Sequence, residues 1–163
     1  TFSNLELIGI DLSDEIITVA IKQAEKIGVK EKIKFEIGSV EKLPFPDDSI
    51  DFIVSTLSLH HWSEPITSFK EISRVLRKDG ISLVFDFQRN SRKFFYGLLT
   101  FATKIVVPKP LKRINEPLGS LKASYNKSEI IQLLTEIPFI KFEIKPYLAW
   151  MFIRIKKSSP SLS

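Results

Sequence analysis

Asp11 is the first residue of this chain whose type and position could do chemistry. It follows the apolar run in "LELIGIDLS" (residues 5–13), at the point where a buried strand should end. In nucleotide-binding α/β folds, a carboxylate at the tip of the second strand accepts hydrogen bonds from ribose hydroxyls, about 20 residues after a glycine-rich loop. Only ten residues precede Asp11, and the six glycines of the chain are scattered. The sequence therefore predicts a ribose-binding acid without the loop that usually accompanies it.

The adjacent histidines His60 and His61 are the second candidate, since imidazole can bind a metal or transfer protons. Neighbouring side chains point in different directions, and no cluster of Asp, Glu or Cys accompanies the pair in the sequence. We therefore predict no metal site, and proton transfer stays as an alternative to no chemical role. The sequence assigns no catalytic residue.

Alternating strands and helices must position these residues. The apolar residues 5–10 predict a strand, and a helix follows from the N-cap Ser13 to Gly28, which stops it. The further elements up to residue 90 are a strand at 32–39, a turn-rich segment at 41–49, a strand at 50–59, a helix at 63–80 and a strand at 81–87. Strands separated by helices indicate right-handed crossovers and a mainly parallel sheet, with ligands at the carboxyl ends of the strands.

The pattern changes after residue 90. We interpret residues 91–124 as an insertion across the mouth of the sheet and residues 126–138 as a short helix that ends at its proline. Residues 139–157 predict two strands with a turn near Pro146, an antiparallel pair that finishes the sheet. We expect a single domain over 1–157 and a flexible tail at 158–163.

The composition fits one globular domain. Of the 163 residues 44% are hydrophobic and 26% are charged, and no apolar run approaches the ~20 residues that span a bilayer. The lack of cysteine excludes disulfides, cysteine-ligated zinc and a cysteine nucleophile. We therefore expect a cytoplasmic protein without a membrane span.

The charge is unevenly distributed along the chain. Residues 1–90 hold 11 Lys and Arg against 15 Asp and Glu, whereas residues 91–163 hold 13 against 4. Such a basic half can mark an anionic partner, but its charges are dispersed rather than grouped in blocks. We interpret it as a solvated lysine-rich face and expect no nucleic-acid partner.

Three motifs in this order and spacing resemble the class I S-adenosylmethionine-dependent methyltransferases of the small-molecule type. They are "LIGIDLS", "GSVEKLPFPDDSIDFIVSTLSLHHW" and "EISRVLRKDGISLVF". The resemblance is close over residues 5–90 and looser over 120–157. It implies a Rossmann-like α/β sheet, mainly parallel with a C-terminal antiparallel hairpin. That sheet would be N-terminally incomplete, because the family's first strand and glycine-rich loop have no counterpart in this sequence.

The resemblance also implies where S-adenosylmethionine would bind. Asp11 would accept hydrogen bonds from the ribose diol, and Leu12 would contact the purine face. Ser39 and Val40 fall where the family binds adenine, and Ser55 falls where the backbone faces the methionine part. Each has a plain alternative, because Asp11 could cap the following helix, Ser39 could be a loop residue and Ser55 an ordinary strand end.

Ser39 departs from the family, which usually has an acid at this position. A serine hydroxyl can still accept a hydrogen bond from the adenine amino group, but it is neutral and shorter, so we expect a weaker contact. The adjacent Glu41 is a substitute in sequence, although solvent is its more usual place.

The implied reaction is methyl transfer to a small, apolar acceptor. The sulfonium already activates the methyl group, so in-line positioning and exclusion of water can supply much of the rate. We expect acceptor choice to depend on the insertion, where several apolar side chains could line a cavity or instead pack on the sheet. These side chains are Phe94, Phe95, Tyr96, Leu98, Leu99 and Phe101.

Two other functions compete with this interpretation. One is a non-catalytic or truncated methyltransferase-like domain that pairs with a partner chain or a second copy, since a sheet without its central strand exposes backbone donors and acceptors. The other is a nicotinamide-dependent oxidoreductase, which would also use an acid like Asp11. The second is disfavoured because "GSVEKLPF" and "LHHW" have no place in it.

Overall fold

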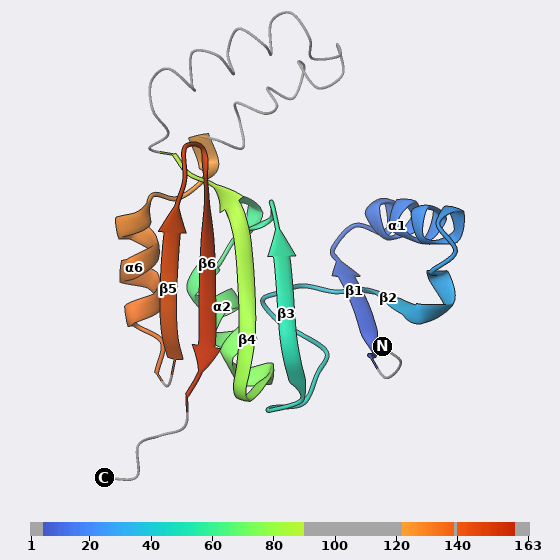
Figure 1. The fold of residues 1–163 in the computed structure, drawn as a ribbon, viewed down its shortest axis with the longest axis horizontal. Helices are drawn as coiled ribbons and strands as arrows, with labels where there is room; N and C mark the ends of the chain where they lie inside the picture. The colour runs from blue at the N-terminus through green and yellow to red at the C-terminus, as the bar shows by residue number, and fades with distance from the viewer. Residues whose placement is uncertain (1–4, 90–121, 139, 159–163) are drawn as a thin grey trace, which may run out of the picture. The chain divides into compact units, whose positions relative to one another are not determined.

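The computed structural model describes residues 5–89, 122–138 and 140–158. The chain divides into two compact units, residues 1–44 and 45–163, and each is described by itself. Figure 1 labels the helices and strands of both. The predicted insertion at 91–124, with its apolar side chains, lies outside the described residues except for 122–124, and of the predicted tail only Ser158 is described.

The first unit is a two-stranded parallel sheet with one long helix. Its elements are β1 (Leu7–Asp11), α1 (Asp14–Lys26), the short 3-10 helix η1 (Lys30–Lys32) and β2 (Ile33–Ile37). Leu7 pairs with Ile33 and Asp11 with Ile37, so the two carboxyl ends lie side by side. This confirms the predicted strand–helix–strand order.

Local signals explain where α1 begins and ends. The Ser13 hydroxyl accepts a hydrogen bond from the backbone N–H of Ile16 at 3.2 Å, as expected of an N-cap. Asp14 and Glu15 lie in the first turn, where negative charge is favourable. Gly28 follows the helix with φ of 73°, a left-handed conformation that glycine adopts without steric cost.

The second unit is a four-stranded sheet. Its elements are β3 (Ile50–Thr56), the 3-10 helix η2 (Leu59–His61), α2 (Pro65–Val75), β4 (Leu76–Phe87), α6 (Lys127–Thr135), β5 (Ile140–Pro146) and β6 (Trp150–Lys157). The strand order is β3-β4-β6-β5, in which β3 and β4 are parallel and the other two pairs are antiparallel. The C-terminal antiparallel hairpin predicted near Pro146 is therefore confirmed, and so is the α/β fold class.

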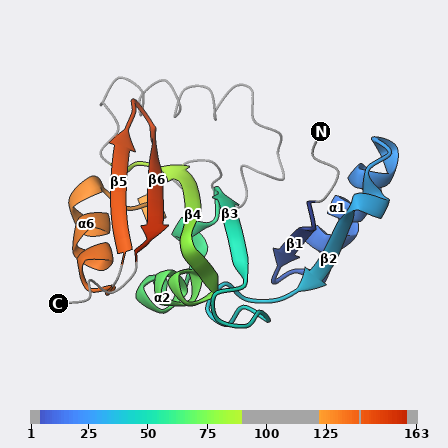
Figure 2. The ribbon, with the colours of Figure 1, turned by 60° about the horizontal axis from the view of Figure 1, so that its bottom comes forward.

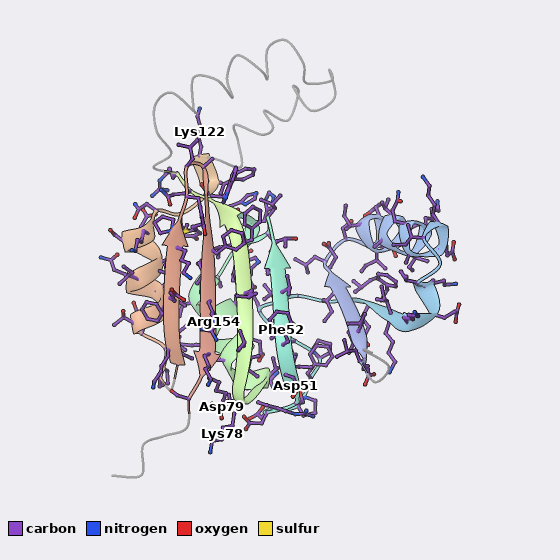
Figure 3. The ribbon with its side chains drawn as sticks, in the orientation of Figure 1. Asp51, Phe52, Lys78, Asp79, Lys122 and Arg154 are labelled. Atoms are coloured by element: carbon purple, nitrogen blue, oxygen red, sulfur yellow. The ribbon has the colours of Figure 1, made fainter. Side chains whose placement is uncertain are left out.

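One face of this sheet carries both helices. α2 and α6 lie on the same side of it (Figures 1 and 2), and the alternation along β6 fits that arrangement. Met151, Ile153 and Ile155 are buried, while Phe152 and Arg154 between them are exposed. By register, Arg154 and Phe52 lie on the other face (Figure 3), which no helix of the described residues in this unit covers. The core of the unit therefore lies between the sheet and the two helices.

The helix predicted at 63–80 is shorter than expected. α2 ends at Val75, and β4 already begins at Leu76. The carbonyls of Arg74 and Val75 accept hydrogen bonds from the backbone N–H groups of Asp48 and Ser49, at 3.0 and 2.8 Å. These tertiary bonds replace the next helical turn, which helix periodicity in the sequence does not reveal.

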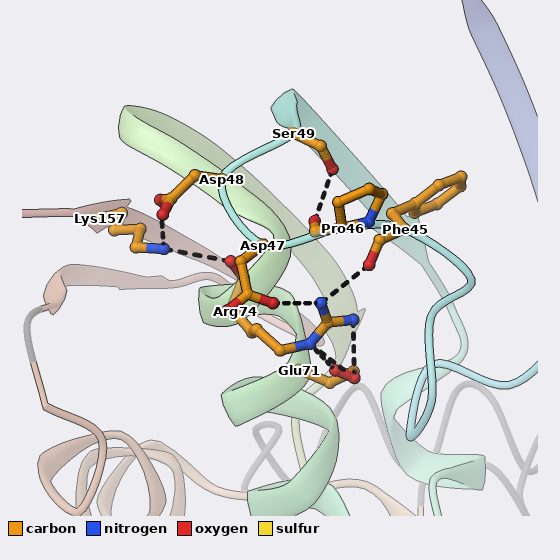
Figure 4. A network of polar contacts seen from close by, with 8 residues as sticks. All are labelled: Phe45, Pro46, Asp47, Asp48, Ser49, Glu71, Arg74 and Lys157. Carbon is orange, nitrogen blue, oxygen red and sulfur yellow. Dashed lines mark hydrogen bonds and ion pairs between the residues drawn. The ribbon is translucent and has the colours of Figure 1, made fainter.

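The segment before β3 that contains Asp48 and Ser49 is also held by a polar network centred on Arg74 (Figure 4). Its guanidinium donates to the carbonyl of Phe45 at 2.8 Å and to the Asp47 carboxylate at 2.7 Å, and it also pairs with Glu71. Hydrogen bonds with Glu71 and then Asp47 raise the pKa of Arg74 above its usual value. Lys157, at the end of β6, adds a 2.7 Å bond to Asp48. The segment that leads into β3 is thus tied to both α2 and β6.

Candidate functional site

The carboxyl ends of β1 and β2 bring four of the predicted residues together. Asp11 is the last residue of β1, and its carbonyl accepts the backbone N–H of Gly38 at 3.0 Å. Ser39 and Val40 follow directly. The structure therefore places Asp11, Leu12, Ser39 and Val40 at one end of the first unit.

Only one oxygen of the Asp11 carboxylate accepts a hydrogen bond from a described residue. Oδ1 accepts the backbone N–H of Ser13 at 2.9 Å, while no described residue donates to Oδ2. Ser13, not Asp11, is the N-cap of α1. Leu12 beside it is 72% exposed. An acceptor oxygen and an exposed aliphatic side chain thus lie together. The oxygen fits a ribose hydroxyl, and the aliphatic side chain fits a purine face.

Ser39 is partly engaged in its own turn. Its hydroxyl oxygen accepts the backbone N–H of Glu41 at 3.1 Å. The hydroxyl hydrogen and one lone pair remain for a ligand. Gly38 lets this turn lie against β1, because a Cβ at Gly38 would come within 3.2 Å of Ile10 Cγ2. The close approach keeps Ser39 next to the end of β1.

A second polar group lies where β3 and β4 end in the other unit. The hydroxyls of Ser55 and Ser58 are 2.5 Å apart. Leu57 between them has φ of 53°, a strained conformation for a residue with a Cβ, and its N–H donates to the carbonyl of Phe85 at 2.8 Å. Such strain persists only where the surroundings impose it, and it clusters at functional sites.

His60 and Asp86 form a buried pair beside this strained turn. Asp86 Oδ1 lies 2.7 Å from His60 Nδ1, and Oδ2 accepts the backbone N–H of His60 at 2.9 Å. The side chains are 2% and 1% exposed. His61 is exposed and contacts His60 with a ring-centroid distance of 4.0 Å. The two histidines therefore have different environments, as expected of neighbouring side chains.

Asp86 is the functional candidate that sequence reasoning missed. It lies inside the apolar strand segment "ISLVFDF", where a buried acid has no local partner. That isolation is the signal that could have found it, because a buried carboxylate needs donors from elsewhere in the fold. Two residues later, the buried Oε1 of Gln88 has no hydrogen-bond donor among the described residues.

Neither group has the composition of a metal centre. The described residues contain no set of three His, Cys, Asp or Glu side chains placed to bind one ion. None of the described helices has the length and apolar character needed to cross a membrane.

Comparison with known proteins relates the sequence that carries these groups to a protein family. Residues 2–84 match the model of the family described as "Methyltransferase domain". The "Uncharacterized methyltransferase YcgJ" of Bacillus subtilis (strain 168) is 42% identical over 81 residues, which cover 50% of this chain and 32% of that protein. The "Demethylmenaquinone methyltransferase" of Geobacillus kaustophilus (strain HTA426) is 26% identical over 149 residues, covering 87% of this chain and 63% of that protein.

A solved structure supports the fold over a longer range. The plantazolicin methyltransferase BamL, in complex with a triazolic desmethylPZN analogue and SAH, aligns with a TM-score of 0.72 at 18% identity. The alignment covers 97% of this chain and 70% of that one. At this identity the likeness concerns the fold alone. The chain spans only about a third to two thirds of the length of these curated relatives.

Proposed function

The chain belongs to the methyltransferase-domain family, and on that premise we propose that the protein transfers a methyl group from S-adenosylmethionine to a small, apolar acceptor. The observation that carries this proposal lies at the carboxyl end of the β1–β2 sheet. There, a carboxylate of Asp11 with one oxygen that accepts no hydrogen bond from a described residue lies beside the exposed Leu12. These are the groups that a ribose and a purine require. S-adenosylmethionine supplies a methyl group already activated on a positively charged sulfur.

The proposal assigns a role to each predicted binding residue. Asp11 Oδ2 accepts from the ribose diol, and Leu12 covers one face of the purine. Ser39 accepts from the adenine amino group while its backbone turn presents the N–H of Val40 to the ring. By the same resemblance, the backbone at Ser55 would face the methionine part of the cofactor. These assignments follow the family resemblance residue by residue.

An apolar acceptor is supported by the nature of the relatives and of the exposed sheet face. One relative is named as acting on demethylmenaquinone, an apolar aromatic quinone. In the second unit, Phe85 lies 4.9 Å from Phe152 and Tyr147 lies 5.6 Å from the same ring, measured between ring centroids. A reduced quinone with a short prenyl chain is therefore the first acceptor to test.

Calorimetry on the full-length protein tests the cofactor assignment. Asp11→Asn keeps an oxygen for the Ser13 N–H but removes the charge that strengthens hydrogen bonds to the ribose. Losing charge-assisted bonds worth about 1.5–3 kcal/mol weakens binding roughly 10- to 150-fold. Asp14→Asn is the matched control, because Asp14 is an exposed acid in the first turn of α1. Equal affinities of the two variants for S-adenosylmethionine would remove Asp11 from the site.

A second candidate function is a pairing module without catalysis. Phe52 and Val54, on the edge strand β3, are 53% and 59% exposed, which is unusual for such side chains. A partner chain or a second copy that covers them would remove these apolar side chains from water. Light scattering on the full-length protein tests this candidate. A protein that stays monomeric at all concentrations and binds no partner chain contradicts it.

A further inference from the structure

We propose that the tip of the β5–β6 hairpin, residues 147–150, and the basic sheet face next to it bind the surface of an anionic lipid bilayer. The docking surface is made of four apolar side chains and two neighbouring cations: Tyr147, Leu148, Trp150, Phe152, Lys145 and Arg154. The inference deepens the proposed function and rests on it for the acceptor, because a quinol with a prenyl chain dissolves in lipid and has to be taken from there.

The hairpin tip exposes apolar side chains on a backbone that is held in place. Tyr147 is 52% exposed and Leu148 is 45% exposed. Trp150 and Phe152, on β6, are 37% and 41% exposed. The backbone N–H of Tyr147 donates to the Trp150 carbonyl at 2.8 Å, and the carbonyl of the buried Ala149 accepts the N–H of the residue that follows β4 at the same distance. The backbone of the tip is therefore fixed before binding, so little conformational entropy is lost when its side chains enter an interface.

The aromatic rings form one cluster on the open face of the sheet. Phe152 lies opposite Phe85 in the β4–β6 register, with 4.9 Å between ring centroids, and Tyr147 meets Phe152 edge-on at 5.6 Å. The Trp150 ring is 6.4 Å from that of Phe85. No helix of the described residues in this unit covers this face (Figures 1 and 2). Trp and Tyr are enriched at membrane–water interfaces, because their rings are apolar while their N–H and O–H groups are polar. The cluster therefore fits the boundary between lipid headgroups and acyl chains.

Cations lie next to the aromatic cluster on the same face. Lys145 is the register partner of Phe152, and Arg154 follows on β6 (Figure 3). Arg154 forms no ion pair with any residue that the structure describes, since its register partner Glu143 pairs instead with Lys145 at 3.2 Å. The charged side chains on this face of β5 and β6 are Lys141, Glu143, Lys145, Arg154 and Lys156. With four cations and one acid, the face has the charge that attracts anionic lipids.

The arrangement favours a bilayer over a single-stranded nucleic acid. The rings contact one another at the hairpin tip instead of lying free to stack on separate bases. The cations follow the rings along the strands, as lipid phosphates follow the acyl boundary. The tip also lies at the edge where β3 ends, because Thr56 pairs with Phe85 and Phe85 pairs with Phe152. An acceptor dissolved in the bilayer would thus meet the protein at the carboxyl ends of the parallel strands, where α/β sheets bind ligands.

Vesicle co-sedimentation of the full-length protein tests the inference. The probes are vesicles of phosphatidylcholine alone and vesicles of equal parts phosphatidylcholine and phosphatidylglycerol. We expect binding to the anionic vesicles that weakens with added salt, and much weaker binding to the neutral ones. The double variant Tyr147→Ser, Leu148→Ser should bind roughly 10- to 100-fold more weakly, because the exposed parts of both side chains no longer leave water. Ile131→Ser is the matched control, because Ile131 is an exposed apolar residue of α6 on the other side of the sheet.

Charge and fluorescence give two further measurements. Arg154→Gln should weaken binding to the anionic vesicles roughly fivefold, whereas Arg77→Gln, at the other end of β4, should leave it unchanged. Trp62→Phe leaves Trp150 as the only tryptophan, and we expect brominated anionic lipids to quench its emission.

Three results would overturn the inference. They are equal binding of the tip variant and the wild type, binding of a single-stranded oligonucleotide without binding of vesicles, and self-association that hides Trp150 from lipid. The vesicle measurements need neither cofactor nor acceptor. A protein that binds anionic vesicles but no S-adenosylmethionine would therefore contradict the proposed function and support the docking surface, so the two failures can be separated.

Discussion

Removing the Arg74 guanidinium should destabilise the protein far more than removing that of Arg77. Both residues are arginines that form close contacts with aspartate, at 2.7 Å for Arg74 and Asp47 and at 2.8 Å for Arg77 and Asp51. Their environments differ. The Arg74 side chain is 33% exposed, whereas that of Arg77 is 53% exposed with a partner that is 77% exposed.

The expected loss for Arg74→Ala follows from its partners. The bond to the Phe45 carbonyl is charge-assisted and contributes about 1.5–3 kcal/mol, since the carbonyl loses its donor. The ion pair with the exposed Asp47 adds about 0–1 kcal/mol. Glu71, whose side chain is 13% exposed, loses a cationic partner. We therefore expect the free energy of unfolding to fall by about 2–4 kcal/mol. Arg77→Ala should cost only about 0–1 kcal/mol, because its pair is solvated.

Urea unfolding of the full chain measures both values. Trp62 is a suitable fluorescent probe, because its ring packs edge-on against the buried Phe69 at 5.2 Å between centroids. Arg74→Lys should lie between the wild type and Arg74→Ala, since lysine keeps the charge but cannot bond several partners with a planar fork. Equal losses for Arg74→Ala and Arg77→Ala would refute the reasoning that burial and the carbonyl bond decide the effect.

Two further predictions concern the second unit. Ser82→Ala should raise the free energy of unfolding by about 1 kcal/mol in urea unfolding, because the fully buried Ser82 hydroxyl has no partner among the described residues; a loss would show a hidden partner. The hydrogen bond and charge of Lys156 lower the pKa of Asp79, so their contribution to stability is present above the normal Asp pKa and lost as pH falls through the lowered value. NMR titration should show this lowered pKa and its return in Lys156→Met, and an unchanged pKa would contradict the pairing.

The parts of the fold that sequence could predict are those set by neighbouring residues. Ser13 and Gly28 bound α1 through their own hydrogen bond and backbone conformation, so they were identified correctly. The end of α2 was misplaced because it depends on backbone bonds from Asp48, which is far away in sequence. Ends of elements that are set by tertiary contacts carry no local pattern.

The candidate site residues differ in the same way, because some can be recognised from the local sequence and others cannot. Asp11 stands out in the sequence because an acid ends an apolar run, and the structure leaves one of its oxygens without a described donor. Asp86 does not stand out, because its partner His60 is 26 residues earlier and only the parallel pairing of β3 with β4 brings the two together. Buried pairs of this kind can be recognised only once the topology is known.

The burial of His60 and Asp86 is not explained by stability alone. Taking two ionisable groups out of water has a desolvation cost that their mutual attraction often does not exceed, and apolar residues of similar size are commonly as stable or more so. The core between the sheet and its helices is filled by such residues, among them Phe69, Ile72 and Ile153. A His–Asp pair at the carboxyl ends of β3 and β4 is therefore a poor solution for stability alone. The pair does fix the orientation of the ring, because one carboxylate contacts both the backbone N–H and Nδ1 of His60.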